Sequence, residues 1–114
     1  MKIMSYNCRG LAGPHKKSAF WRIIFLDCPD IILLQETLGE GVVVKARLEG
    51  WLLGWTFETL DVRGRSGGLA VGWNDRTIKP LNFWGMESVL SLNFLALELG
   101  EAFNKDPFLG LTPG

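Results

Sequence analysis

The sequence is poor in the residue types that most often carry catalysis. Its 114 residues include one histidine, His15, one tyrosine, Tyr6, and two cysteines, Cys8 and Cys28. The two cysteines form no zinc-binding pattern. The residues before them have none of the features of a signal peptide, so we expect both thiols to be reduced and the protein to be intracellular.

A net charge and a long apolar run are also missing. Twelve basic and twelve acidic residues cancel, so the overall charge does not indicate a nucleic-acid or membrane partner. Every apolar run ends well short of the roughly 20 residues that span a bilayer, so we expect a soluble protein without a membrane partner. Residues 1–26 nevertheless carry five basic side chains and no acidic one. This basic end either faces phosphate or forms an ordinary solvated helix face.

The hydrophobic pattern predicts one α/β domain. Alternating residues at 2–7 and an apolar run at 30–36 predict two strands, and the second is typical of a strand buried on both faces. Between them, residues 15–27 form an amphipathic helix that begins after Pro14 and ends before Pro29.

The later part of the chain is predicted to be mostly antiparallel strands. A short helix is expected at 42–48, although its run of valines disfavours one. The expected strands span residues 51–57, 66–73, 77–84 and 88–99, with a loop at 61–65. Asparagine, proline and glycine make residues 100–114 an irregular tail after a domain of residues 1–99.

Two oxygen-bearing side chains stand at the ends of the first two predicted strands, Asn7 and Glu36. Sites in α/β sheets form outside the carboxyl ends of strands, and an amide oxygen with a carboxylate suits a hydrated Mg²⁺ ion. We therefore expect both side chains at one sheet edge, where they would share a hydrated cation. The alternatives are an Asx-turn for Asn7 and a solvated side chain for Glu36.

Three short stretches carry a family resemblance. Residues 5–11 read Ser-Tyr-Asn-Cys-Arg-Gly-Leu, residues 30–37 read Asp-Ile-Ile-Leu-Leu-Gln-Glu-Thr, and residues 64–70 read Gly-Arg-Ser-Gly-Gly-Leu-Ala. In this order they resemble the endonuclease/exonuclease/phosphatase superfamily, most closely the endonucleases of plant non-LTR (LINE-type) retrotransposons. The resemblance implies the N-terminal half of a four-layer α/β sandwich with a mixed or antiparallel sheet. It also implies DNA as partner and the nucleus as location.

By this resemblance Glu36 holds Mg²⁺, and Asn7 is a second ligand or orients the attacking water. Arg9 and Arg65, next to matched motifs, are candidate phosphate contacts, with ordinary surface arginines as the alternative. Gly67 and Gly68 would let backbone approach a substrate closely, or simply give a flexible start to a strand. Four tryptophans at predicted strand positions either stack on bases or belong to the core: Trp51, Trp55, Trp73 and Trp84.

The resemblance also implies late elements that this sequence does not contain. A second tyrosine, an Asp-x-Asn element and an Asp-His element are missing; Asn104-Lys105-Asp106 has the reverse order, and no histidine follows His15. We therefore expect a truncated domain that binds Mg²⁺ weakly and does not cleave DNA alone. The alternatives are a half-domain completed by a missing half, a phosphatase-type member, or a non-catalytic remnant. A remnant would bind nucleic acid or a protein, or self-associate through an exposed sheet.

Overall fold

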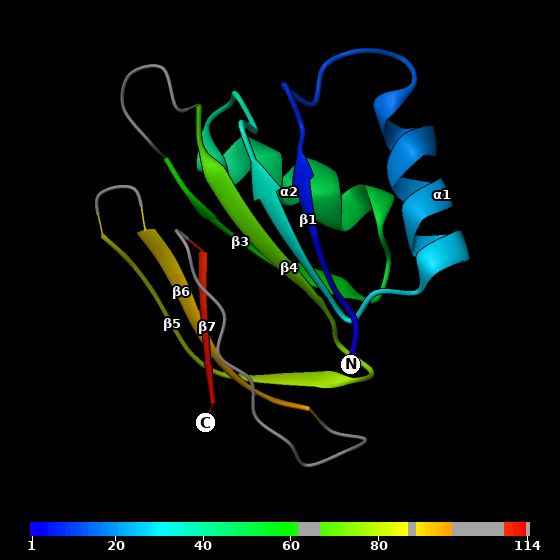
Figure 1. The fold of residues 1–114 in the computed structure, drawn as a ribbon. Coiled ribbons are helices and arrows are strands. Elements are labelled where there is room, and N and C mark those ends of the chain that lie inside the picture. The colour runs from blue at the N-terminus through cyan, green and yellow to red at the C-terminus, as the bar shows by residue number, and fades with distance from the viewer. Residues whose placement is uncertain (62–66, 87–88, 97–108, 114) are drawn as a thin grey trace.

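Two helices and seven strands make up the part of the chain that the structure, a computed structural model, describes: residues 1–61, 67–86, 89–96 and 109–113 (Figure 1). In chain order the elements are β1 (Ile3–Asn7), α1 (Lys16–Asp27), β2 (Ile31–Gln35), α2 (Gly41–Trp51), β3 (Trp55–Leu60), β4 (Leu69–Asn74), β5 (Ile78–Met86), β6 (Val89–Ala96) and β7 (Leu109–Pro113). Neither described helix is both long and apolar enough to cross a membrane.

The first sheet has the strand order β1-β2-β4-β3 and mixes parallel and antiparallel pairs. β1 runs parallel to β2 with Asn7 opposite Gln35, and β4 runs antiparallel to β2 with Leu69 opposite Gln35. The carboxyl ends of β1 and β2 therefore meet the start of β4 at one end of the sheet. The second sheet has the order β5-β6-β7, with β5 and β6 antiparallel and β6 and β7 parallel.

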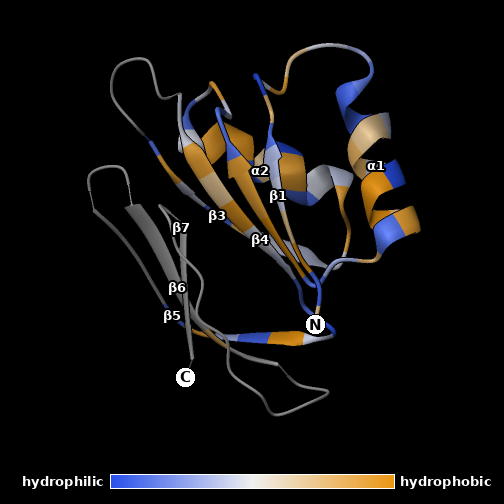
Figure 2. Cartoon of the chain, in the orientation of Figure 1, coloured by the Kyte–Doolittle hydropathy of each residue, from blue (hydrophilic) through white to orange (hydrophobic). Residues whose placement is uncertain are grey.

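β2 separates two apolar cores, because successive side chains of a strand point to opposite faces. Ile32 and Leu34 face the helices, where they pack with Phe20 of α1 and Leu48 of α2. Ile31 and Leu33 face the second sheet, whose Ile78 and Phe94 join them. Both faces of the first sheet are thus covered, by helices on one side and by strands on the other (Figure 1). The hydrophobic colouring of β4 and α2 in Figure 2 agrees with this burial.

These observations confirm the predicted α/β class, the mixed sheet and the fully buried second strand. All four residues from Ile31 to Leu34 are buried. Helix α1 begins and ends within one residue of its prediction, and α2 exists but is longer than residues 42–48. Burial of Val44 and Leu48 against the sheet stabilises α2 despite the β-branched residues.

Two predictions about the strands are wrong. Trp51 ends α2 rather than starting a strand, and β3 begins only at Trp55, after a turn in which Gly54 takes a positive φ of 83°. The predicted irregular tail contains β7, which pairs with β6 from Leu109 to Pro113. Long-range pairing overrides the local proline and glycine signals there, and a terminal proline is tolerated on an edge strand. Residues 62–66 and 97–108 lie outside the described residues.

Candidate functional site

Three loops meet where β1 and β2 end and β4 begins. The loop after β1 is tied to β2, because Cys8 N donates to Gln35 O at 2.8 Å and Gly10 N donates to Glu36 O at 2.8 Å. The loop after β2 is tied to the start of β4, because Leu38 N donates to Gly67 O at 2.5 Å. These backbone hydrogen bonds fix the position of Glu36 between the other two loops.

Asn7 and Glu36 meet at this end of the sheet. The Asn7 Nδ2 group donates to the Glu36 carboxylate oxygen Oε2. The Asn7 Oδ1 atom accepts a hydrogen bond from Arg9 N at 3.1 Å, which is the Asx-turn arrangement. The prediction that the two strands are adjacent and that these side chains converge is confirmed. Asn7 also forms the Asx-turn that was the alternative interpretation, since its Nδ2 donates to Glu36 while its Oδ1 accepts from Arg9 N.

Glu36 occupies an unusual backbone conformation. Its φ is 52°, and Arg9 and Leu38 in the same loops have φ values of 49° and 51°. The left-handed region costs a side-chain-bearing residue about 1–2 kcal/mol, so local sterics oppose this arrangement. Positive φ at non-glycine residues concentrates at functional sites, where the surrounding structure maintains it. The loop hydrogen bonds provide that support here.

Gly67 and Gly68 lie against the Glu36 loop rather than open space. A Cβ on Gly67 would lie 2.2 Å from Leu38 Cδ2, and one on Gly68 would lie 2.5 Å from Thr37 Oγ1. Both glycines also have positive φ, 67° and 96°. They therefore allow β4 to begin close beneath the loop that carries Glu36. Their direct contact with a substrate stays a prediction.

Arg9 is exposed beside Asn7, whereas Arg65 lies outside the described residues. The tryptophans divide between core and surface: Trp55 and Trp73 are buried, as the core interpretation predicted, and Trp51 is half-buried. The Trp84 side chain lies outside the described part of the structure. In this structure the buried rings of Trp55 and Trp73 are therefore not available to stack on a base.

Two further side chains at this edge are held in place by burial and hydrogen bonding. Cys8 is 1% exposed. Burial raises the pKa of its thiol to about 12, with Lys16 opposing the rise and Glu36 adding to it. Lys16 Nζ donates to Cys8 O at 2.7 Å. Cys8 is therefore protonated at neutral pH and does not serve as a nucleophile or base.

The donor set at the edge suits a weakly held hard cation. Among the described residues no group of three or more histidine, cysteine or acidic side chains could hold a metal. Glu36 supplies the carboxylate that meets Asn7, whose Oδ1 keeps a second lone pair beside its bond to Arg9 N. Mg²⁺ keeps most of its waters and accepts one or two carboxylates, so these residues fit that ion at low affinity.

A groove of about 410 Å³ lies beside this edge and contains a residue that the sequence analysis missed. Arg47 of α2 lines it together with Arg9. Nothing in the sequence near Arg47 matches a motif, and its place depends on how α2 packs on the sheet. The one signal for Arg47 in the sequence was its position one helical turn after Val43.

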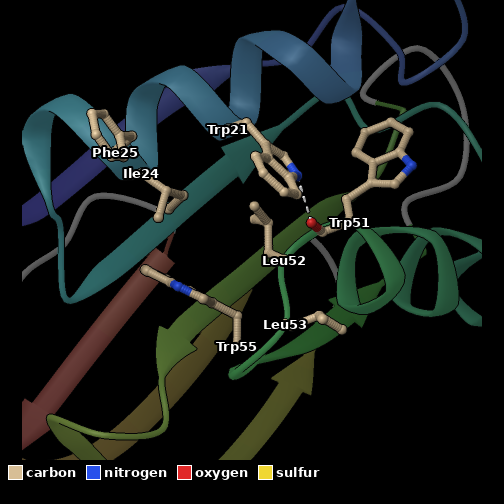
Figure 3. Close-up of a pocket in the computed structure, with 7 residues that line it drawn as sticks. All are labelled: Trp21, Ile24, Phe25, Trp51, Leu52, Leu53 and Trp55. Carbon is tan, nitrogen blue, oxygen red and sulfur yellow. Dashed lines mark hydrogen bonds between the residues drawn. The ribbon is translucent and has the colours of Figure 1, made fainter.

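A second groove lies at the opposite end of the sheet and is apolar (Figure 3). Side chains of α1 and of the segment after α2 line it, and Trp21 Nε1 donates to Trp51 O at 2.7 Å across it. No charged side chain is among its lining residues. This groove therefore offers no chemistry for a phosphodiester.

No protein-family model matches the chain. No curated protein matches it either. The motifs and the geometry around Glu36 are therefore the observations that bear on function.

Proposed function

We propose that this chain is an endonuclease-like domain of retroelement origin, related to the N-terminal half of the endonuclease/exonuclease/phosphatase fold, that binds Mg²⁺ weakly and does not cleave DNA by itself. The observation that carries the proposal is the contact between Asn7 and Glu36 at the ends of two adjacent parallel strands. Both residues belong to motifs that resemble the superfamily. The two-sided covering of the first sheet supports the same proposal.

Asn7 and Glu36 have separable tasks in this proposal. The Asn7 amide fixes one carboxylate oxygen, Oε2, so the carboxylate of Glu36 has a defined orientation at the sheet edge. Within the described residues Oε1 of Glu36 accepts no hydrogen bond, and it is the atom that would hold the ion. Bound Mg²⁺ supplies charge stabilisation at a phosphoryl oxygen. Asn7 then acts as a positioning residue.

Turnover is not expected, because two titratable side chains that the structure describes close to Glu36, those of Cys8 and Lys16, are not available to deprotonate a water molecule. Cys8 holds its proton, and Lys16 is bound to a carbonyl oxygen. His15 precedes α1 as its N-cap residue and makes no side-chain capping bond. General-base catalysis contributes about 10²–10⁴-fold to rate, and neither Cys8 nor Lys16 supplies it.

A plasmid-nicking assay with Mg²⁺ tests the proposal. Nicking of supercoiled plasmid should not exceed the background rate with the wild-type chain, with Glu36→Ala or with Asn7→Ala. Arg76→Gln serves as a control for changes in surface charge, since Arg76 is exposed and follows β4 at the far end of the sheet. Nicking by the wild-type chain that disappears in both Glu36→Ala and Asn7→Ala would overturn the proposal that the chain lacks catalysis.

Self-association is a second candidate function, and the surface of α1 favours it. Trp21 and Phe25 are 57% and 82% exposed, and Leu53, which lines the same groove from the segment after α2, is 86% exposed (Figure 3). Contiguous apolar surface of this kind commonly marks a protein interface. Sedimentation velocity should then show a mass that rises with concentration, less so in Phe25→Ser. A monomer at every concentration would exclude this candidate.

A further inference from the structure

The groove beside Glu36 is lined by both basic and apolar side chains. Its lining comes from the loop after β1, the loop after β2 and the first two turns of α2. Arg9 and Arg47 supply two positive charges, and the exposed side chains of Leu38 and Val43 supply apolar surface. These side chains come from segments far apart in the sequence, so the fold creates the combination.

The two guanidinium groups are available to a ligand. Within the described residues neither Arg9 nor Arg47 forms an ion pair or a side-chain hydrogen bond, and both are exposed. No acidic side chain lines the groove. The nearest motif carboxylate, Glu36, accepts from Asn7, and Asp61 accepts from Gly41 N at 2.7 Å. The two guanidinium groups therefore make the lining of the groove positive, with the Glu36 carboxylate beside it.

Two guanidinium groups beside apolar surface match the chemistry of a nucleotide. A guanidinium can donate two parallel hydrogen bonds to phosphate oxygens. The apolar side chains can cover the sugar or the face of a base, as in proteins that bind single strands. A volume of about 410 Å³ is at the small end of ligand sites, too small for a duplex.

We propose that this groove binds one nucleotide of a single-stranded nucleic acid, with Arg9 and Arg47 holding its phosphate and Leu38 and Val43 contacting its sugar or base. This proposal rests on the proposed function for its substrate class, nucleic acid. It adds a binding position for that substrate next to Glu36. Binding in the groove requires no metal ion. The two proposals can therefore fail separately.

Fluorescence anisotropy with a labelled oligothymidylate in EDTA tests the groove. Arg9→Gln and Arg47→Gln should each weaken binding about tenfold, the effect of losing one charge-assisted contact. Each should also lower the slope of log affinity against log salt by about 0.7. Arg76→Gln, which removes an equal charge at the other end of the sheet, should bind like the wild type.

Further variants separate a loss of folding from a loss of contact. Arg47→Lys keeps the charge but loses the two-pronged geometry, so its affinity should lie between the wild type and Arg47→Gln. An abasic oligomer of the same length should bind more weakly than oligothymidylate, because Leu38 and Val43 then have no base to contact. Equal affinity of the two oligomers, or equal losses in Arg76→Gln and Arg47→Gln, would overturn the proposal.

Glu36→Gln distinguishes this inference from the proposed function. In EDTA the variant should bind oligothymidylate at least as tightly as the wild type, because it removes a negative charge next to the groove. If the wild-type chain binds the oligomer but shows no Glu36-dependent Mg²⁺ binding, the groove proposal stands and the metal site is refuted. Binding of Mg²⁺ without binding of the oligomer would refute the groove alone.

Discussion

Gly68→Ala should destabilise the fold through one identifiable contact. Gly68 has a φ of 96°, and an added Cβ would lie 2.5 Å from Thr37 Oγ1. Thr37 is 3% exposed and lies next to Glu36 in the loop after β2. Because its side chain is β-branched and buried, it has little freedom to move aside.

The cost can be estimated from two parts. Placing a Cβ-bearing residue in the left-handed region costs about 1–2 kcal/mol. Forcing an extra methyl group into a packed site costs about 1–3 kcal/mol more. The free energy of unfolding should therefore fall by about 2–5 kcal/mol, a large part of the stability of a small domain.

A double-mutant cycle with Thr37→Ala separates the two parts. Thr37 Oγ1 lies 3.5 Å from Gly67 O, a long contact, so Thr37→Ala alone should cost only about 1 kcal/mol. In that background Gly68→Ala should cost only the backbone part, which leaves a coupling energy of about 1–3 kcal/mol. Urea unfolding followed by tryptophan fluorescence measures all four free energies.

Additive free energies would refute this reasoning. If Gly68→Ala costs the same with and without the Thr37 side chain, no steric contact links β4 to the Glu36 loop. A Gly68→Ala variant as stable as the wild type would contradict the left-handed backbone as well.

The remaining predictions concern packing and thiol chemistry. Gly72→Ala should cost about 1–3 kcal/mol, because its Cβ would lie 2.2 Å from the fully buried ring of Phe57, whereas Gly50→Ala, with no atom within 4 Å, should stabilise α2 by up to about 1 kcal/mol. Thermal unfolding of both variants checks this pair, and a loss in Gly50→Ala as large as in Gly72→Ala would contradict it. A thiol reagent at neutral pH should modify exposed Cys28 in the folded protein and reach Cys8 only after unfolding, as mass spectrometry would show.

Much of the first sheet followed from local sequence pattern. The apolar run of β2 was predicted correctly because a strand buried on both faces needs apolar residues at every position. The proximity of Asn7 and Glu36 could be predicted from the sequence, since the carboxyl ends of neighbouring parallel strands share one edge. These inferences needed only element type and order.

The errors arose where tertiary packing decides the structure. Trp51 has a strand-forming side chain, yet burial of Leu48 and Leu52 extends α2 to this residue. Pairing of β7 with β6 involves residues far apart in the sequence and has no local signature. Arg47 was missed for the same reason, because its position beside Arg9 depends on the packing of α2.

The most direct test of the proposed metal site is a calorimetric titration with Mg²⁺. The wild-type chain should bind one ion weakly, and Glu36→Gln, which keeps the shape but removes the charge, should abolish the signal. Asp27→Asn, which removes an exposed carboxylate at the end of α1, should bind like the wild type. Equal Mg²⁺ binding by Glu36→Gln and the wild type would contradict the assignment of this edge as a metal site.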